Sequence, residues 1–313
     1  MLLLALSAQM ARAEGDALLW LTRIHVATQK LSYTGTFVYR SGDQAETSRV
    51  VHVVGRRGTR ERLETLDGHP REIVRSGDEV KCYLPESMTI KVDKQTDHKV
   101  FPSFLPQSLQ DIGEHYEVRT AAIQRIAGHD CQAIVLQPKD KFRYGRKLCA
   151  DVKTGMLIKS QIINDKNEPI EQFAFTQISI GGKIDYDQLK SRLLAKSHDW
   201  HVENSGAITA SLAASGWTIK PELPGFKKVT EMKRTQGGSD EVGHVVYSDG
   251  LAAISVFIEP MASKTSLPPA GLSHQGAINI YSRQVASHLV TVVGEAPAES
   301  VRKLAESVEY HTP

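Results

Sequence analysis

Between residues 33 and 180, short runs rich in β-branched and aromatic residues follow one another at regular spacing. They lie near 33–39, 46–54, 60–66, 71–76, 79–84, 88–92, 115–126, 129–137, 143–150, 155–164 and 169–180. Turn dipeptides separate several of them, with Ser-Gly at 41–42 and 76–77 and Asp-Gly at 67–68. Regular strands with few helices predict one large antiparallel sheet.

Helical patterns flank this series of strands. An amphipathic helix is expected over 15–31, a short one near 105–112 and another at about 184–195. The stripe of the first helix is formed by Leu18, Leu21, Ile24, Thr28 and Leu31. We expect these helices to cover one face of a curved sheet. The two layers then either enclose an apolar cleft, as in carriers of hydrophobic ligands, or form a fully packed core.

The character of the chain changes after residue 195. Residues 196–216 are small and polar and are expected to link a large domain (14–195) to a smaller α+β domain (217–313). The smaller domain should contain a hairpin around Asp249-Gly250, a pair typical of a type I′ turn. Two strands at 276–282 and 286–293 and a helix over 297–309 complete it. The expected fold class is therefore α+β.

Composition and the N-terminus bear on the compartment. The 313 residues include 38 basic and 36 acidic side chains, a net charge of +2 that gives no reason to expect nucleic acid as the main ligand. Residues 1–13 combine an apolar run with the small-x-small site Ala11-Arg12-Ala13, which predicts a signal peptide and an exported mature protein. The basic start of such a peptide is missing, so we expect it to be truncated. The alternative is the N-terminus of a cytosolic protein.

Three cysteines are present: Cys82, Cys131 and Cys149. The segment from Cys131 to Cys149 has the pattern of two strands joined by a polar turn. If that hairpin is centred on Asp140, the two cysteines stand opposite each other and are close enough for a disulfide. Cys82 would then remain a buried thiol.

The motifs of common catalytic centres are missing. No Gly-rich phosphate loop, HExxH or GxSxG is present. Ser300 and Lys303 match the SxxK of serine acyl enzymes, and His198 and His201 could approach a metal, but neither pair has companion residues at the usual spacing. We therefore expect no enzymatic activity, no cofactor and no metal.

Two sets of residues are candidates for ligand binding. The first consists of apolar side chains that could line a cleft: Phe37, Tyr39, Tyr83, Phe101, Phe104 and Leu105. The second belongs to an arginine-rich stretch between residues 49 and 75, from which Arg56, Arg57 and Arg60 could hold an anionic headgroup or an acidic partner. The alternative for these arginines is a solvated face with ion pairs to Glu61, Glu64 and Glu72.

Three stretches together resemble a known family. They are Leu31-Ser-Tyr-Thr-Gly-Thr-Phe-Val-Tyr39, then Phe142-Arg-Tyr-Gly-Arg-Lys-Leu-Cys-Ala-Asp151 with Thr154-Gly-Met-Leu-Ile-Lys-Ser160, and finally Glu222-Leu-Pro-Gly-Phe226 with Val246-Tyr-Ser-Asp-Gly-Leu251. In this order they resemble the RseB/MucB family of periplasmic regulators of the envelope-stress (sigma-E) factor. The resemblance covers essentially the whole chain after the leader.

The resemblance implies a large domain similar to the lipoprotein carriers LolA and LolB, with a half-barrel sheet, and a smaller C-terminal domain. It also implies binding to the periplasmic part of a membrane-bound anti-sigma factor, which is thereby shielded from proteolysis, and release by lipopolysaccharide or another lipid. A second copy of the chain is a further candidate partner. A lipid or lipoprotein carrier that only shares the fold remains the alternative.

Overall fold

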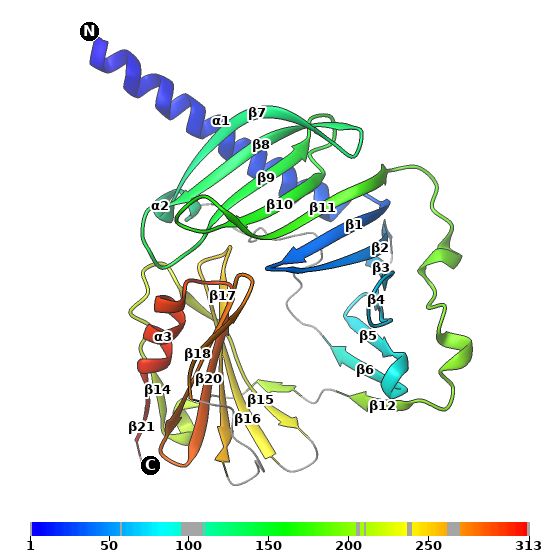
Figure 1. The fold of residues 1–313 in the computed structure, drawn as a ribbon, viewed down its shortest axis with the longest axis vertical. Helices are drawn as coiled ribbons and strands as arrows, with labels where there is room; N and C mark the ends of the chain where they lie inside the picture. Colours follow the sequence, from blue (N-terminus) through cyan, green and yellow to red (C-terminus); the bar gives the residue numbers. More distant parts are fainter. Residues whose placement is uncertain are drawn as a thin grey trace.

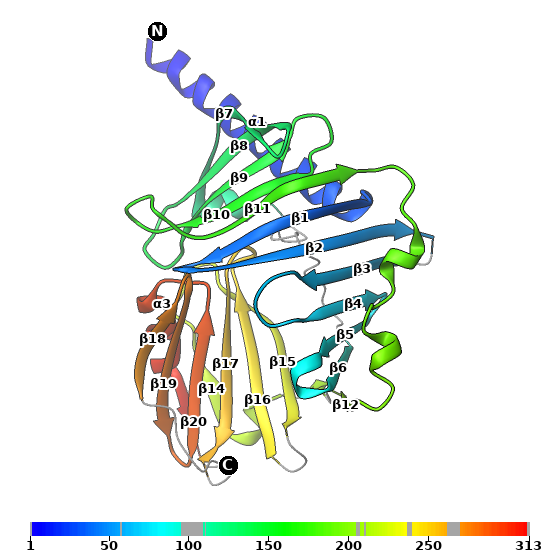
Figure 2. The same cartoon turned by 45° about the vertical axis from the view of Figure 1, so that its right-hand side comes forward.

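The computed structural model of the chain describes residues 2–56, 58–94, 109, 111–204, 207–209, 211–236, 240–261 and 270–311. Its strands form a curled sheet of twelve strands, a second sheet of seven and a separate pair (Figures 1 and 2). Helices are few, and the α+β class expected from the sequence is confirmed. None of the helices in the described part is long and apolar enough to span a membrane.

The large sheet contains every strand that the sequence predicted between residues 33 and 180. Its order is β12-β6-β5-β4-β3-β2-β1-β11-β10-β9-β8-β7, antiparallel except for the parallel pair β12 and β6. The strands are β1 (Tyr33–Ser41), β2 (Gln44–Gly55), β3 (Gly58–Thr65), β4 (Glu72–Ser76), β5 (Glu79–Leu84), β6 (Thr89–Lys94), β7 (Tyr116–Ile126), β8 (His129–Pro138), β9 (Gly145–Asp151), β10 (Leu157–Ile163), β11 (Pro169–Ile180) and β12 (His201–Asn204). A 3-10 turn, η1 (Pro85–Ser87), precedes β6.

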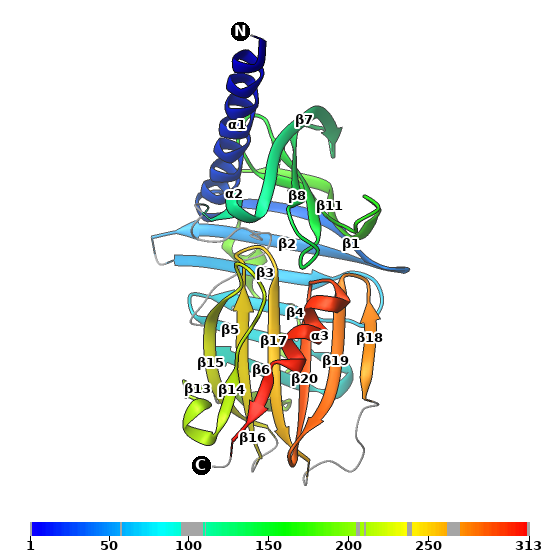
Figure 3. The same ribbon diagram turned by 90° about the vertical axis from the view of Figure 1, so that its left-hand side faces the viewer.

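The helix α1 (Leu2–Lys30) packs on β7 and β10 and projects beyond the sheet at its N-terminal end (Figure 3). Its buried side includes Ala17, Leu21 and Ile24, which lie against apolar residues of the β7–β10 region. The period of this stripe matches the predicted amphipathic pattern. A short helix, α2 (Ile112–His115), leads into β7; most of the segment predicted near 105–112 falls outside the described residues.

The prediction of a helix at about 184–195 is wrong. The chain forms two 3-10 turns there, η2 (Tyr186–Leu189) and η3 (Leu194–Lys196). Between them, the Ser191 hydroxyl and the Arg192 amide both donate hydrogen bonds to the buried carboxylate of Glu72 on β4, and these bonds hold the segment flat against the sheet.

The sequence predicted that this segment and α1 cover the same face of the sheet. In the structure they lie on opposite faces. Leu189 packs on Val51 and Val53 of β2. The strand registers from β9 to β2 place Leu148, which clusters with α1, and Val51 on opposite faces.

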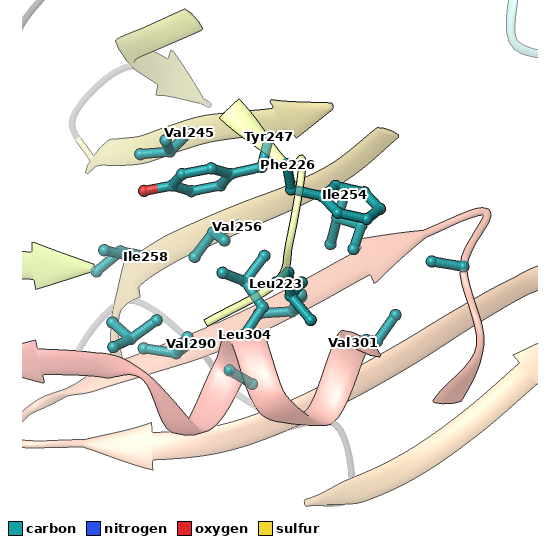
Figure 4. Close-up of a cluster of buried hydrophobic side chains, with 14 of the residues drawn as sticks. Leu223, Phe226, Val245, Tyr247, Ile254, Val256, Ile258, Val290, Val301 and Leu304 are labelled. Carbon is teal, nitrogen blue, oxygen red and sulfur yellow. The ribbon is translucent and has the colours of Figure 1, made fainter. Parts of the chain in front are cut away.

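The small sheet has the order β13-β15-β16-β17-β20-β19-β18. Its strands are β13 (Ala207–Thr209), β15 (Lys227–Gln236), β16 (Asp240–Ser248), β17 (Ala253–Pro260), β18 (Gly271–Gln275), β19 (Ile278–Val285) and β20 (His288–Gly294). The helix α3 (Ala298–Glu306) packs on β19 and β20, and Val301 and Leu304 enter the core between the sheet and the helix (Figure 4). The helix is shorter than the predicted 297–309 because the chain continues as β21 (Val308–Tyr310), which pairs with β14 (Trp217–Ile219).

Two local expectations for the second half also differ from the structure. The segment 196–216, expected as a linker, contributes β12 to the large sheet and β13 to the small one, and carries a 3-10 turn, η4 (Ala213–Ser215). Four residues, 249–252, join β16 to β17. A type I′ turn needs positive φ at both central residues; Gly250 has φ of 97°, whereas Asp249 does not have positive φ. The predicted turn type is therefore wrong.

Candidate functional site

The arginines predicted to hold an anionic group lie at the β2–β3 hairpin. A cavity of about 330 Å³ beside it is lined by Val53, Gly55, Arg56, Gly58, Arg60 and Tyr186. The guanidinium carbon of Arg60 lies 5.9 Å from the centre of the Tyr186 ring, within range of a cation–π contact. Arg57 lies outside the described residues. The cavity thus combines two cations with an exposed aromatic ring.

Three other arginines of the same stretch, Arg49, Arg62 and Arg71, are paired with carboxylates, whereas Nε and Nη1 of Arg75 have no hydrogen-bond partner among the described residues. Arg62 is buried and contacts Glu64 and Glu72 at 3.3 and 3.4 Å, while Arg49 contacts Glu64 at 3.8 Å. Burial lowers the pKa of Arg62, although the two carboxylates oppose that effect. No such ion pair is formed by Arg56 or Arg60 within the described part of the chain. The ion-pair alternative therefore holds for Arg49 and Arg62, whereas Arg56 and Arg60 have no carboxylate partner in the described part of the chain.

The aromatic residues predicted to line one cleft are not brought together. Phe37 is buried and packs edge-to-face on Phe173 and Phe175, with ring centres 4.9 and 6.0 Å apart. Tyr39 is half-buried on the same face. Tyr83 lies on the opposite face. The registers from β1 to β5 place Cys82, the residue before it, on the same face as Phe37.

Phe37 and Tyr83 therefore cannot line one common cleft, and the packed-core alternative holds for Phe37. The remaining candidates, Phe101, Phe104 and Leu105, lie outside the described residues.

The structure contains a disulfide between Cys131 and Cys149, with an S–S distance of 2.05 Å and a Cα–Cα distance of 5.4 Å. The predicted register differs, since Cys131 stands opposite Asp151 and Cys149 stands opposite Ala133. The bridge therefore runs diagonally between β8 and β9. Cys82 on β5 is a half-buried free thiol, and burial raises its pKa.

A second candidate site, which the sequence did not predict, is the joint between the two sheets. The loop after β8 inserts Arg143 into it, and Arg143 Nη1 lies 2.8 Å from Asp249 Oδ2 of the β16–β17 connection. Arg143 also donates hydrogen bonds to Asp140 and to the carbonyl of Pro224, and the Tyr116 hydroxyl donates to Asp249 at 3.0 Å. Charged groups buried this completely require such full pairing.

Further contacts extend the joint on both sides. Arg146 of β9 contacts Glu295 at 3.2 Å and donates to the carbonyl of Leu251 at 3.0 Å. Other contacts across the joint are the hydrogen bonds Asn279–Tyr144, Ser300–Phe142 and Gln275–Gln44 and the ion pairs Lys141–Glu299 and Lys227–Asp111. The two sheets are therefore held together by polar contacts that involve both buried and exposed groups.

The structure also explains the isolated chemical motifs. Ser300 of the SxxK pattern is fully buried, and its hydroxyl donates to the carbonyl of Phe142 at 2.8 Å, which makes it a contact of the joint and not a nucleophile exposed on the surface. His198 is exposed and pairs with its neighbour Asp199. The described residues contain no cluster of three or more metal-ligating side chains.

The architecture is that of a two-domain protein: a curled half-barrel sheet is joined to a second, smaller sheet, with a cation-lined cavity on the first and a polar joint between them. Comparison with known families gives the group. Residues 16–193 match the MucB/RseB N-terminal domain and residues 211–309 match the MucB/RseB C-terminal domain, so the chain belongs to the MucB/RseB family.

Relatives in this family align over nearly the whole chain. The sigma factor AlgU regulatory protein MucB of Pseudomonas aeruginosa is 31% identical, covering 98% of this chain and 95% of its own. The sigma-E factor regulatory protein RseB of Haemophilus influenzae is 25% identical, covering 93% and 90%. The crystal structure of MucB in complex with MucA(peri) superposes with a TM-score of 0.73 at 29% identity, covering 95% of this chain and all of that one.

Proposed function

We propose that this chain is a regulatory binding protein of the periplasm that holds the periplasmic part of an anti-sigma factor, protects it from proteolysis and so keeps an envelope-stress sigma factor inactive. The observation that carries the proposal is the match over both domains to MucB, a protein solved in complex with MucA(peri). The superposition on that structure covers 95% of this chain and therefore includes residues of both sheets.

The compartment and the parts of the chain follow from the same proposal. Residues 1–13 would be a signal peptide, 14–195 a lipid-sensing domain, 196–216 the connection and 217–313 the smaller domain. The disulfide between Cys131 and Cys149 supports an oxidising compartment such as the periplasm. A homodimer remains a candidate assembly.

The release signal would be a lipid or lipopolysaccharide. Support comes from the cavity beside Arg56, Arg60 and Tyr186, where two guanidinium groups without a carboxylate partner in the described part of the chain adjoin an exposed ring. Guanidinium groups bind phosphate oxygens in bidentate fashion. A phosphorylated lipid headgroup is the ligand chemistry that such a cavity favours.

A lipid or lipoprotein carrier is the second candidate, because the half-barrel sheet alone would serve it. The small sheet and its buried contacts to the large one favour the regulator, since a carrier has no evident need of them.

The test is binding of the purified mature chain to the isolated periplasmic domain of the anti-sigma factor from the same organism, followed by protease digestion of that domain. We expect a stable complex and slower cleavage of the anti-sigma domain, with serum albumin as the control protein. Failure to bind it, combined with capture of many unrelated lipoproteins from envelope extract, would establish the carrier instead.

A further inference from the structure

The carboxylate of Glu171 is buried near the joint, close to the start of β11. Its residue is 7% exposed, and Oε2 has no hydrogen-bond partner among the described residues. The hydroxyl of Tyr39, on the neighbouring strand β1, donates a hydrogen bond to this carboxylate. An ionised carboxylate with an unsatisfied oxygen in such a place is costly.

Among the described residues, Arg146 is the one cation that lines the small cavity at Glu171, and it also has a second carboxylate partner. Arg146 lies on the same face as Glu171, since Arg146 pairs with Ile162 and Ile162 pairs with Glu171 across three neighbouring strands. Its guanidinium is already engaged with Glu295, which follows β20 and therefore belongs to the small-sheet side of the joint. The two carboxylates come from opposite sides of the joint and depend on one guanidinium.

The charged and titratable groups that face Glu171 are Tyr39 from β1, Arg146 from β9 and Glu295 from the other side of the joint. Burial and the negative charge of Glu295 raise the pKa of Glu171 to about 7, against the opposing effects of the Tyr39 hydrogen bond and Arg146. The remaining residues around the small cavity at Glu171 carry no charge; they are Ser160, Ile162, Gln172 and Phe173.

We propose that Glu171, Arg146 and Glu295 form a proton-linked latch between the two sheets. When Glu171 carries a proton, Glu295 is the only ionised carboxylate of the three side chains, and it pairs with Arg146. The three side chains then have no net charge. When Glu171 is ionised, the group carries one buried negative charge, and Glu171 repels the carboxylate that reaches across the joint. The closed joint is therefore favoured below neutral pH and loosened above it.

The direction follows from linkage. Because the pKa of Glu171 is raised in the closed state, that state binds more protons than an open one in which the carboxyl has its usual value of 4.5. The stabilisation is complete below about pH 4.5 and is lost as the pH rises towards 7. The closed-to-open ratio should fall by at most about 300-fold over this range, the factor for a pKa that moves from 4.5 to about 7.

The regulatory consequence rests on the proposed function: a partner that contacts both sheets would bind with a pH-dependent affinity. The latch itself can be tested on the full mature chain without any partner. Spin labels at Arg125→Cys on β7 and Leu272→Cys on β18, both exposed positions, report the distance between the sheets. Cys82→Ser removes the free thiol from this background.

We expect the distance distribution to be broader at pH 8.5 than at pH 6, because the closed joint loses the last of its proton-linked stabilisation as the pH rises through about 7. Glu171→Gln, which imitates the protonated carboxyl, should keep the narrow distribution at both values. Glu299→Gln is the matched control, because Glu299 also reaches across the joint but is exposed and pairs with Lys141. The distance distribution of Glu299→Gln should broaden as that of the parent does.

A parent distribution that is the same at pH 6 and 8.5, or a Glu171→Gln variant that still broadens, would overturn the latch. Binding of the anti-sigma domain, measured separately at pH 6, tests the proposed function independently of either result.

Discussion

Arg143 and Asp249 are 106 positions apart in the chain, yet their side chains form a 2.8 Å ion pair in which neither is exposed to solvent. Asp249 Oδ2 also accepts the Tyr116 hydroxyl, while Oδ1 accepts the amides of Leu251 and Ala252 and closes its own turn. One carboxylate thus shapes the β16–β17 connection and attaches it to the large sheet.

Removing the charge of Asp249 should therefore loosen the joint. Asp249→Asn keeps the size of the side chain and an acceptor for its turn, but removes the fully buried carboxylate partner of Arg143 and leaves it with Asp140 alone among the described residues. Breaking a buried pair in this way costs about 3–5 kcal/mol. Denaturant unfolding should show a loss of up to that size, because Asp140 still pairs with Arg143. Lys227→Ala, which breaks an exposed pair across the same joint, should cost no more than about 1 kcal/mol. Equal small losses in both variants would contradict the structural importance of the buried pair.

The disulfide gives a second prediction. Peptide mapping without reduction should recover Cys131 joined to Cys149, with Cys82 as a free thiol. Replacing both bridged cysteines with alanine should lower the free energy of unfolding by roughly 2–4 kcal/mol, because a loop closed over 18 positions is released in the unfolded chain. Cys82→Ser should leave the bridge and most of the stability intact. A mixed disulfide of Cys82 with either partner would show that the β8–β9 register is wrong.

The large sheet was predictable because its signals are local. Period-two alternation and turn dipeptides mark strands such as β1, β2 and β11, and their bounds differ from the predicted runs by a few residues. The segment at 184–195 was not predictable in the same way, because its helical pattern loses to hydrogen bonds from Ser191 and Arg192 to Glu72, more than 100 positions earlier.

The contacts at the joint between the two sheets could not be predicted from local sequence patterns either. Arg143 and Asp249 stood within the stretches that resemble the MucB/RseB family, but no local pattern says that an arginine in one domain and an aspartate in the other will meet. The hairpin register failed by two residues for a related reason: the loop 139–144 is held by Arg143 and Asp140, and not by a tight turn centred on Asp140.

Acid should weaken the β9–β10 turn through Asp151. Burial alone would raise the pKa of this carboxyl, but hydrogen bonds from Thr154 and His129 outweigh burial and lower it below its usual 3.8. The resulting stabilisation is present above that value and is lost as the pH falls through the lower pKa of the folded state. Asp151→Asn should cost about 1–3 kcal/mol at pH 7 and flatten the decline in stability below pH 4.

Denaturant titrations between pH 2 and pH 7 measure this effect. The control is Asp130→Asn, which changes an exposed carboxylate on β8 that pairs only with the exposed Arg125 among the described residues. An unchanged acid limb in Asp151→Asn would rule out Asp151 as its source.

Two of the candidates predicted to line the cleft, Phe37 and Phe104, give a further prediction. Phe37→Ala should destabilise the large domain by about 3–5 kcal/mol, because the ring packs against two phenylalanines in the core. Phe104→Asp, in the segment expected to cap the cleft, should weaken binding of fluorescent lipid more than it lowers the melting temperature. Melting curves and lipid titrations of the two variants, side by side, measure both effects. Equal losses of stability and binding in Phe104→Asp would favour a packed core without a lipid site.

The last prediction concerns release of the partner at the β2–β3 hairpin. A lipid can displace a protein partner only if it binds the partner-free state more tightly. If phosphates engage Arg56, Arg57 and Arg60, vesicles containing phosphorylated lipid should displace the anti-sigma domain better than neutral vesicles of the same chain length. The difference should shrink as salt is raised from 0.02 to about 0.3 M, because charges on an exposed rim are screened.

Replacing the three arginines with glutamine should erase this difference while leaving partner binding largely intact. Arg125→Gln, an exposed arginine on β7 far along the sheet from the hairpin, is the matched control and should behave as the parent. Displacement is measured by fluorescence anisotropy of the labelled anti-sigma domain at each salt concentration. If the triple variant instead loses the partner and keeps its response to phosphorylated lipid, the hairpin belongs to the protein interface, and lipid must enter elsewhere on the sheet.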